Sequence, residues 1–313
     1  MGHGPGLIIP INTTSQTERT LFVQSFRFHG SQQRHSKLKM GSELNPDWTE
    51  LTWECLINIF SRLSMEQRWG GPMLVCKTWM NVCNDPLLNS VFDLETGFLS
   101  SIETWNWWTS EFAEKVDSTL MSVVERSKGG LKEIRVRHCT NESLFYVADR
   151  CPNLEVLSVK HCPNVTAEPM KMIALKCPKI MELDLSCTYA ISHECMVMFG
   201  ENCKNLQVMK RNNVPLSEVW MFESYENYMA NQPIFTLVNI DAHAIGFYMP
   251  QLKHLEVRYL KMSDNALACI CKNCKKLEYL DLFGCPNLTM SGVINSTSTL
   301  KNLKELKMPD FTG

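Results

Sequence analysis

Cysteine is the residue type whose number and spacing first suggest chemistry in this chain. The 313 residues include 14 cysteines, and Cys271 and Cys274 form a Cys-x-x-Cys pair with Cys269 two residues upstream. Thiolates at this spacing are typical zinc ligands. Cysteine also recurs at a regular interval, however, and a cysteine repeated in this way packs as a small hydrophobic side chain. We therefore predict core cysteines and no metal site. The interval places Cys139, Cys151, Cys162, Cys177, Cys187, Cys203, Cys274 and Cys285.

Catalytic signatures are absent from the sequence. It contains no Gly-rich phosphate loop, no Gly-x-Ser-x-Gly elbow and no His-Glu-x-x-His helix. The eight histidines are scattered, so a Cys/His nucleophilic pair would have to be assembled by the fold. We expect no catalytic residue and no cofactor, and an enzyme remains a remote alternative.

Composition limits the environment and the partners. The formal net charge of −2 provides no basic field for nucleic acid, and no apolar run is long enough to span a bilayer. A secretory signal is not recognisable, so we expect reduced thiols in the cytoplasm or nucleus. A secreted receptor ectodomain would instead use the cysteines and the Asn-x-Ser/Thr sequons, and intact free thiols in the purified protein would argue against it.

Two amphipathic patterns follow one another between Leu51 and Leu94. The first has apolar residues at helical spacing from Leu56 to Leu63, and the second begins at Pro72, which suits a first helical turn. Asp85-Pro86 ends the second pattern, because a residue before proline is disfavoured in the α region. About forty residues cannot bury this apolar surface alone. The segment must therefore pack on a neighbour or bind a partner.

The same segment resembles the F-box, a helical module that docks on the Skp-type adaptor of cullin-based ubiquitin ligases. The family's "IFSRL" helix appears at 59–63, its "VCKxW" at 75–79 and its "DPxL" close at 85–88. Thr52 stands where proline is usual, and Leu88 where tryptophan is common. Some of the residues that the resemblance assigns to adaptor contact must instead form the core of the module. The assigned residues are Leu51, Leu56, Ile59, Leu63, Val75, Cys76 and Trp79.

From Leu131 onward the chain repeats the frame Leu-x-x-Leu-x-Leu-x-x-Cys. Copies begin at 131, 154, 180 and 206, an interval within the leucine-rich-repeat range, and short apolar helices that end in cysteine recur with them, at Cys151, Cys177, Cys203 and Cys274. The units resemble cysteine-containing leucine-rich repeats. We therefore expect an α fold (the F-box helices) followed by an α/β solenoid, in which stacked units share one core.

The expected domain order has four parts. We predict a disordered tail at 1–46, an F-box at 47–94, a linker with a capping helix at 95–130, and repeats at 131–313. In the linker, Trp105, Trp107 and Trp108 are expected to wedge the first module against the second. An insertion near 214–235 lengthens one repeat, and such loops often lie on a binding face.

Residues between the core leucines should line the concave side of the solenoid, because strand residues alternate faces. This set is mixed in sign and forms no basic stripe, which disfavours nucleic acid as a partner. The alternative is a plain solvated sheet face. The candidate substrate-binding residues, with two aromatic residues of the insertion, are Arg135, Arg137, Lys160, Asp184, Lys210, Trp220, Tyr225, Glu256, Arg258, Asp281 and Phe283.

The F-box resemblance implies a non-catalytic, substrate-recognition subunit of a Skp–cullin–F-box ubiquitin ligase. Its partners would be a Skp-type adaptor, through it a cullin, and a protein substrate that the sequence does not identify. The layout is similar to the short plant F-box/leucine-rich-repeat proteins. The main alternative is a leucine-rich-repeat scaffold whose F-box-like helices only cap the solenoid. Adaptor binding distinguishes the two.

Overall fold

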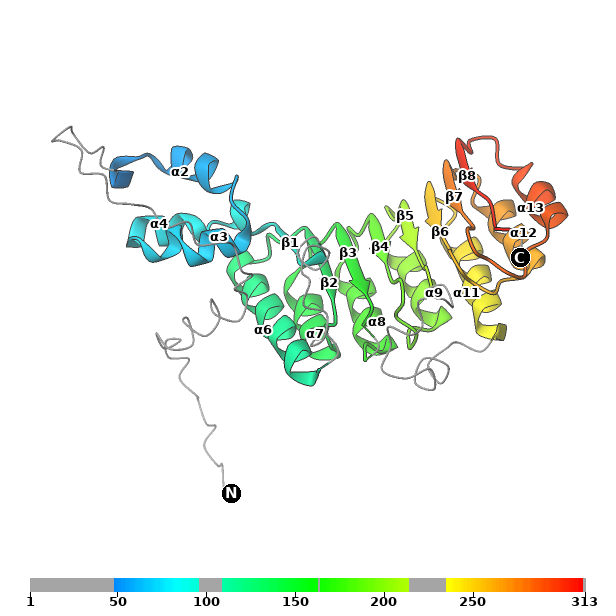
Figure 1. Cartoon of the computed structure of the whole chain (residues 1–313), viewed down its shortest axis with the longest axis horizontal. Coiled ribbons are helices and arrows are strands. Elements are labelled where there is room, and N and C mark those ends of the chain that lie inside the picture. The colour runs from blue at the N-terminus through cyan, green and yellow to red at the C-terminus, as the bar shows by residue number, and fades with distance from the viewer. Residues whose placement is uncertain (1–47, 96–108, 163, 214–234, 312–313) are drawn as a thin grey trace, which may run out of the picture. The chain divides into compact units, whose positions relative to one another are not determined.

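The computed structural model describes residues 48–95, 109–162, 164–213 and 235–311 (Figure 1). The chain divides into two compact units, Met1–Asn84 and Asp85–Gly313, and each is described by itself. The tail predicted at 1–46, the three linker tryptophans and the insertion residues Trp220 and Tyr225 lie outside the described residues.

The first unit consists of short helices. Ser64 and Gln67 form a capping box, in which the Ser64 hydroxyl accepts from Gln67 N–H and the Gln67 side chain accepts from Ser64 N–H. The continuous helix that we predicted through Leu63 therefore ends at Phe60, and a separate helix starts at Met65. The elements are η1 (Trp48–Glu50), α2 (Trp53–Phe60), α3 (Met65–Gly70), η2 (Pro72–Leu74) and α4 (Lys77–Cys83).

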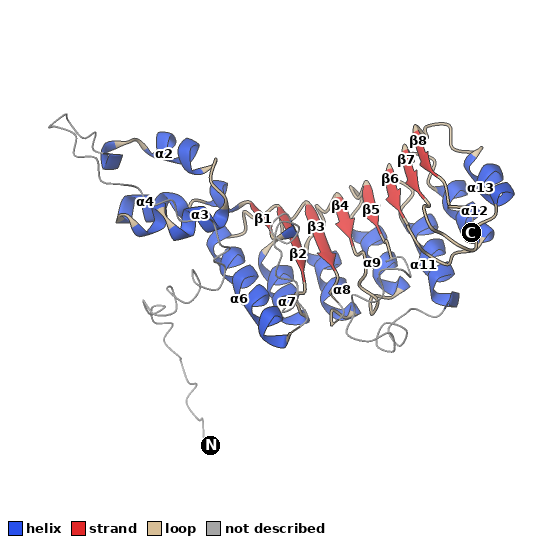
Figure 2. Cartoon of the chain, in the orientation of Figure 1, coloured by secondary structure: helices blue, strands red, loops and turns tan. Residues whose placement is uncertain are grey.

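The second unit alternates strands and helices (Figure 2). Its described strands form one eight-stranded parallel sheet in the order β1 to β8, and the helices of this unit lie along one side of that sheet. The strands are β1 (Val91–Asp93), β2 (Glu133–Arg137), β3 (Val156–Lys160), β4 (Glu182–Asp184), β5 (Val208–Lys210), β6 (His254–Glu256), β7 (Tyr279–Asp281) and β8 (Glu305–Lys307). The helices are η3 (Pro86–Asn89), α6 (Ser110–Ser127), α7 (Asn141–Arg150), α8 (Ala167–Lys176), α9 (His193–Asn202), α11 (Phe235–Tyr248), α12 (Asp264–Asn273) and α13 (Met290–Thr297).

The sheet departs from the expected repeat boundaries at its start. Strand β1 lies within the segment that we assigned to the F-box, yet it pairs in register with β2, Phe92 opposite Ile134. Strand β5 pairs directly with β6, so the long interval between them lengthens a single repeat. None of the described helices combines the length and apolarity needed to cross a bilayer.

The repeated leucines form the predicted core. Leu131, Leu154 and Ile180 are fully buried, as are Ile134, Leu157 and their counterparts up to Leu280, whereas Leu303 and Leu306 of the last repeat are half-buried. Each side chain lies against the equivalent one in the next repeat because the strands are parallel and in register. A single unit could not bury this surface, so the stability of the solenoid depends on stacking.

The cysteines follow the repeat as core residues. Cys151, Cys177, Cys203 and Cys274 each cap the C-terminus of a helix and are fully buried. Burial raises the pKa of the Cys271 and Cys274 thiols to about 12, which opposes the thiolate that zinc requires. No cluster of potential metal ligands occurs in the parts of the chain that the structure describes.

Cys187 was assigned to the wrong repeat position. Its backbone is left-handed, with φ 57°, as at Tyr259 and Gly284 in the turns after other strands. Thr188 occupies the position of the strand-following cysteine, and its hydroxyl donates to the Val159 carbonyl at 2.8 Å, as the Cys285 thiol does to Val257. The repeat is therefore complete at this point, with threonine in place of cysteine.

Hydrogen bonds between consecutive repeats hold the helix starts. The Asp117 carboxylate in α6 accepts from the Thr140 N–H and hydroxyl and from the Ser143 hydroxyl, all in the next repeat. In the later repeats, Asp264 accepts in the same way from Thr289. The bonds from Thr140 N–H and Thr289 N–H satisfy backbone donors at the helix starts, and the hydroxyl bonds fix the capping side chains.

Asp117→Ala is expected to destabilise the second unit by about 2–3 kcal/mol, because it leaves the half-buried donors of Thr140 and the buried hydroxyl of Ser143 without their acceptor. Urea unfolding followed by circular dichroism would measure the loss. The matched control is Asp149→Ala, since Asp149 is exposed and pairs only with Lys176 at the surface. Equal losses in the two variants would contradict the capping role of Asp117.

Candidate functional site: two partner-binding surfaces

The structure separates the predicted adaptor residues of the first unit into core and surface. Leu56 is fully buried and forms the core with Phe60, whose ring meets the Trp79 ring edge-on at 5.2 Å. Ile59 and Val75 are 41% and 58% exposed. Leu51, Leu63, Cys76 and Trp79 are half-buried. Only the exposed and half-buried residues can contact a partner without unfolding the unit.

Further apolar side chains accompany Ile59 and Val75 on the surface. Trp53 and Leu74, which we did not predict, are also exposed. Large apolar side chains that stay exposed in a small unit are candidates for contact with a partner. We call Trp53, Ile59, Leu74 and Val75 the apolar patch.

The two departures from the F-box pattern have structural roles. Thr52 is the N-cap of α2, where its hydroxyl accepts from Cys55 N–H at 3.4 Å, a bond that proline could not make. Leu88 is buried in η3, which packs against α6 within the second unit. Both substitutions are therefore compatible with the local fold.

Most of the predicted substrate-binding residues lie on the face formed by the outward side chains of the strands, which we call the strand face. One row in register contains Arg135, Ser158, Asp184, Lys210 and Glu256 from consecutive strands. Sequence alternation placed these residues on a common face, but it could not show how their charges pair.

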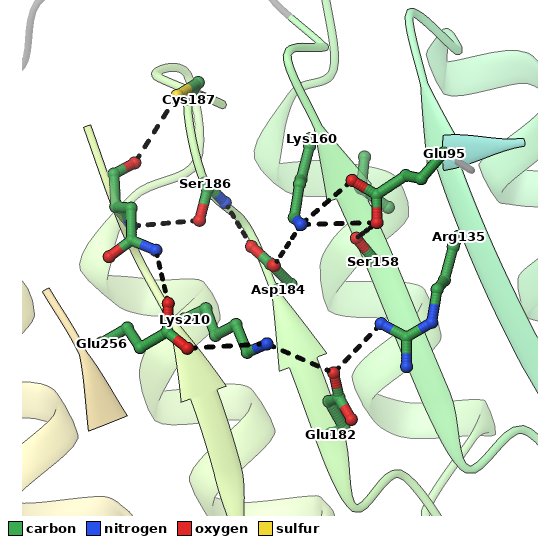
Figure 3. Close-up of polar contacts among 12 residues, drawn as sticks. Glu95, Arg135, Ser158, Lys160, Glu182, Asp184, Ser186, Cys187, Lys210 and Glu256 are labelled. Carbon is green, nitrogen blue, oxygen red and sulfur yellow. Dashed lines mark hydrogen bonds and ion pairs between the residues drawn. The ribbon is translucent and has the colours of Figure 1, made fainter. Parts of the chain in front are cut away.

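At the N-terminal end of the strand face the charges are satisfied within the chain (Figure 3). Glu95, which follows β1, lies 3.0 Å from Lys160 and 3.5 Å from Arg137. Lys160 also pairs with Asp184 at 3.1 Å, and its ion pairs raise the pKa of the Lys160 ammonium despite burial. Arg137 and Lys160 thus already have anionic partners.

The centre of the strand face continues this network. Glu182 lies 3.1 Å from Arg135 and 3.8 Å from Lys210, and Lys210 lies 3.6 Å from Glu256 (Figure 3). Burial opposes the ionisation of Glu256, but hydrogen bonds from His254 and Asn212 and the Lys210 charge hold its pKa below the ordinary range. These side chains form a ladder of alternating charge across neighbouring strands.

The C-terminal end of the strand face is more open. The side chains of Arg258 and Phe283 are 42% and 38% exposed. The Arg258 guanidinium lies 5.5 Å from the Phe283 ring centroid and 5.9 Å from that of Tyr259, and Asp281 is 3.6 Å away. A Cβ at Gly284 would come within 2.2 Å of the Tyr259 ring, so the glycine makes room for this ring. Arginine flanked by aromatic rings is typical of interface hot spots.

Two histidines lie at equivalent positions of consecutive repeats, although the sequence analysis treated the histidines as scattered. His138 and His161 both precede a strand-following cysteine, and both have left-handed backbones with φ 58° and 48°. Burial, together with nearby positive charge, lowers their pKa values to about 3 and about 4. Both imidazoles are therefore neutral at physiological pH and serve as packing residues of the turn.

Arg211 is a charged residue at a core position. Its equivalents in the neighbouring repeats are Leu185 and Val257, whereas Arg211 donates to the carbonyls of Leu185, Thr188 and Ile191 at 2.7–3.0 Å. Asp241 of α11 lies 3.7 Å from the guanidinium. The pair borders a small cavity of about 20 Å³, room for a water but not for an organic ligand.

The Asp241 carboxyl should make stability depend on pH. Burial raises its pKa even though Arg211, and His193 further off, favour the charged form. Above the ordinary carboxyl range, near pH 4, the unfolded Asp241 loses its proton while the folded one retains it. The free energy of unfolding should therefore fall as the pH rises towards the raised pKa. Urea unfolding over this range should show that slope in the natural protein and lose it in Asp241→Asn. If the free energies of unfolding of the two proteins differed by the same amount at every pH, the raised pKa of Asp241 would be contradicted.

Comparison with known proteins agrees with both units. The F-box domain family matches residues 48–90. Putative F-box/LRR-repeat protein 19 of Arabidopsis thaliana is 56% identical over 277 residues, covering 88% of this chain and 91% of that protein. F-box protein SKIP1 of the same species is 47% identical over 264 residues, covering 84% of this chain and 87% of that protein. The fold and these relatives together show that the chain belongs to the F-box/leucine-rich-repeat family.

Proposed function

We propose that this protein is a substrate-recognition subunit of a Skp–cullin–F-box ubiquitin ligase. The apolar patch carries this proposal: Ile59 and Val75 are exposed in a segment matched to the F-box, while Leu56 and Phe60 provide its internal core. A Skp-type adaptor would cover the patch and link the chain to a cullin. The protein would act in the cytoplasm or nucleus, where its buried cysteines remain reduced.

The target would bind the strand face of the solenoid, and its C-terminal end is the better candidate. Arg258 and Phe283 remain accessible there, whereas Arg137 and Lys160 are held by Glu95. Binding to the occupied end would require breaking partly buried ion pairs, which carries a desolvation cost. At the open end Arg258 also pairs with Asp281, but its side chain is more exposed than those of Arg137 and Lys160, so the cost should be smaller.

The role is positional and non-catalytic. Holding the target near a ubiquitin-charged enzyme raises the effective concentration of its lysines at the reacting thioester. This chain would supply binding and orientation, and the reactive cysteine would belong to a separate subunit. Burial raises the pKa of the Cys177 and Cys203 thiols to about 12, as expected for packing residues.

Affinity purification of the full-length chain under proteasome and neddylation inhibition tests the proposal. We expect a Skp-type adaptor and a cullin to be recovered with the chain. A variant lacking residues 48–84 should lose both proteins. Failure of the full-length chain to recover an adaptor, while a known F-box protein succeeds, would favour the alternative of a repeat scaffold without a ligase role.

A further inference from the structure

Exposed lysines lie close together at one edge of the second unit, in the loops that connect the last helices to the strands that follow them. They lie in three loops, at 249–253, 274–278 and 298–304, in which the one acidic residue is Glu278. Glu278 pairs with Lys304. We call the five exposed lysines of these loops the lysine edge: Lys253, Lys275, Lys276, Lys301 and Lys304.

The backbone places these loops side by side. Glu278 N–H donates to the Lys253 carbonyl at 2.7 Å, and Lys304 N–H donates to the Glu278 carbonyl at 2.8 Å. The spacing between neighbouring strands is about 4.8 Å, well within the Debye length of about 10 Å at moderate salt. The five ammonium groups therefore act as one positive field that a single carboxylate does not neutralise.

Local interactions account for only part of the lysine edge. Lys275 donates to the Cys271 carbonyl at 2.9 Å and to the Thr299 hydroxyl at 3.0 Å, which satisfies the end of α12. Within the described residues, the side-chain ammonium groups of Lys253, Lys276 and Lys301 make no hydrogen bond or ion pair. Their mutual repulsion costs stability, so packing does not explain why they gather here.

Earlier repeats show that the fold does not require this charge. On the same edge, Lys132 pairs with Glu155 at 3.0 Å, and Lys179 donates to the Asn153 side chain at 2.7 Å. Lys204 donates to the Gly200 carbonyl at the end of α9. Lys128 and Lys204 on this edge also lack an acidic partner, but each is the one such lysine in its loop, whereas the last three loops carry five lysines and one glutamate.

We propose that the lysine edge binds an acidic polypeptide segment, an extended stretch rich in glutamate and aspartate. The positive strip is narrow, because Glu256, Asp281 and Glu305 lie just beyond it on the strand face. Each of these carboxylates is paired with a cation of the strand face, so the positive field does not extend beyond the strip to match the broad phosphate surface of a duplex or a bilayer. A single extended chain can follow the strip, and lysines act as mobile point charges for its carboxylates without the rigid fork that phosphate favours.

Fluorescence anisotropy of a labelled oligoglutamate peptide with the full-length protein tests this proposal, which does not depend on the ligase role. We expect binding at low salt that weakens steadily as salt is added. The triple variant Lys253→Glu, Lys276→Glu, Lys301→Glu should bind at least about tenfold more weakly. Its thermal stability should be unchanged or higher, because the repulsion is relieved.

The matched control is Lys115→Glu, Lys176→Glu, Lys179→Glu, which makes the same change of net charge on exposed lysines of earlier helices and loops. This control should retain peptide binding. Equal losses of peptide affinity in both triple variants would show that binding depends only on the net charge of the protein, and would overturn the proposal. Absence of peptide binding would also overturn it, as would tighter binding of single-stranded DNA or of phosphatidylserine vesicles at the same salt concentration.

Discussion

Ile59→Asp combined with Val75→Asp is expected to weaken binding of a Skp-type adaptor by about 100-fold or more while leaving the first unit folded. Both side chains are exposed, so charge at these positions costs the free protein little. In a complex the same carboxylates would be desolvated in an apolar interface, and two such changes at a hot spot amount to several kcal/mol. Calorimetric titration with purified adaptor would measure the affinity.

Two comparisons make the result interpretable. Leu56→Asp places a charge in the core beside Phe60 and should unfold the unit, which circular dichroism would reveal. Asn81→Asp adds charge at an exposed site of α4 outside the apolar patch and should bind normally. Full adaptor affinity in the double variant with an intact helical spectrum would show that the docking surface lies elsewhere.

Arg211→Leu should destabilise the second unit by about 3–5 kcal/mol, although leucine occupies the equivalent position in the preceding repeat. The substitution leaves the carbonyls of Thr188 and Ile191 without their donor and leaves the Asp241 carboxyl buried beside an apolar side chain. Chemical denaturation of the natural and variant proteins would give the difference.

Adding Asp241→Asn to Arg211→Leu should recover part of this loss, because the uncompensated carboxylate is removed while the carbonyls remain unpaired. The two effects should therefore be non-additive. Leu185→Val, at the equivalent position of the preceding repeat, provides the scale of an ordinary core change, about 1 kcal/mol. A loss from Arg211→Leu no larger than that would show that the guanidinium is not needed to hold this repeat.

The sequence predicts those features of the fold that depend on local periodicity. The leucine frame identified the strands and the buried columns, and the capping helix expected within 95–130 is found at Ser110–Ser127, with Thr109 as its N-cap. The copy that begins at Leu206 departs from the frame at its third core position, which is Arg211. Extending the frame by two residues would have revealed a charge in the core.

Pairing between residues far apart in the chain could not be predicted in this way. Alternation places Lys160 on the strand face, but its partner Glu95 lies outside the repeat frame and is 65 residues away. The resemblance to the F-box assigned Leu56 and Ile59 to one set, and only burial separates them into core and surface. The sequence therefore predicts which residues share a face. Only the structure shows which of them are accessible and which are buried or paired within the chain.

The alternating ladder of charge on the strand face limits how this solenoid can change in length. Strand β5 contributes Lys210 between Asp184 and Glu256 of the flanking strands. Glu256 already faces Asp281 in register, so excision of that one repeat would bring three carboxylates side by side without Lys210 between them, and like charges in register destabilise a sheet. The units are therefore not interchangeable, because each one carries charges that its neighbours pair.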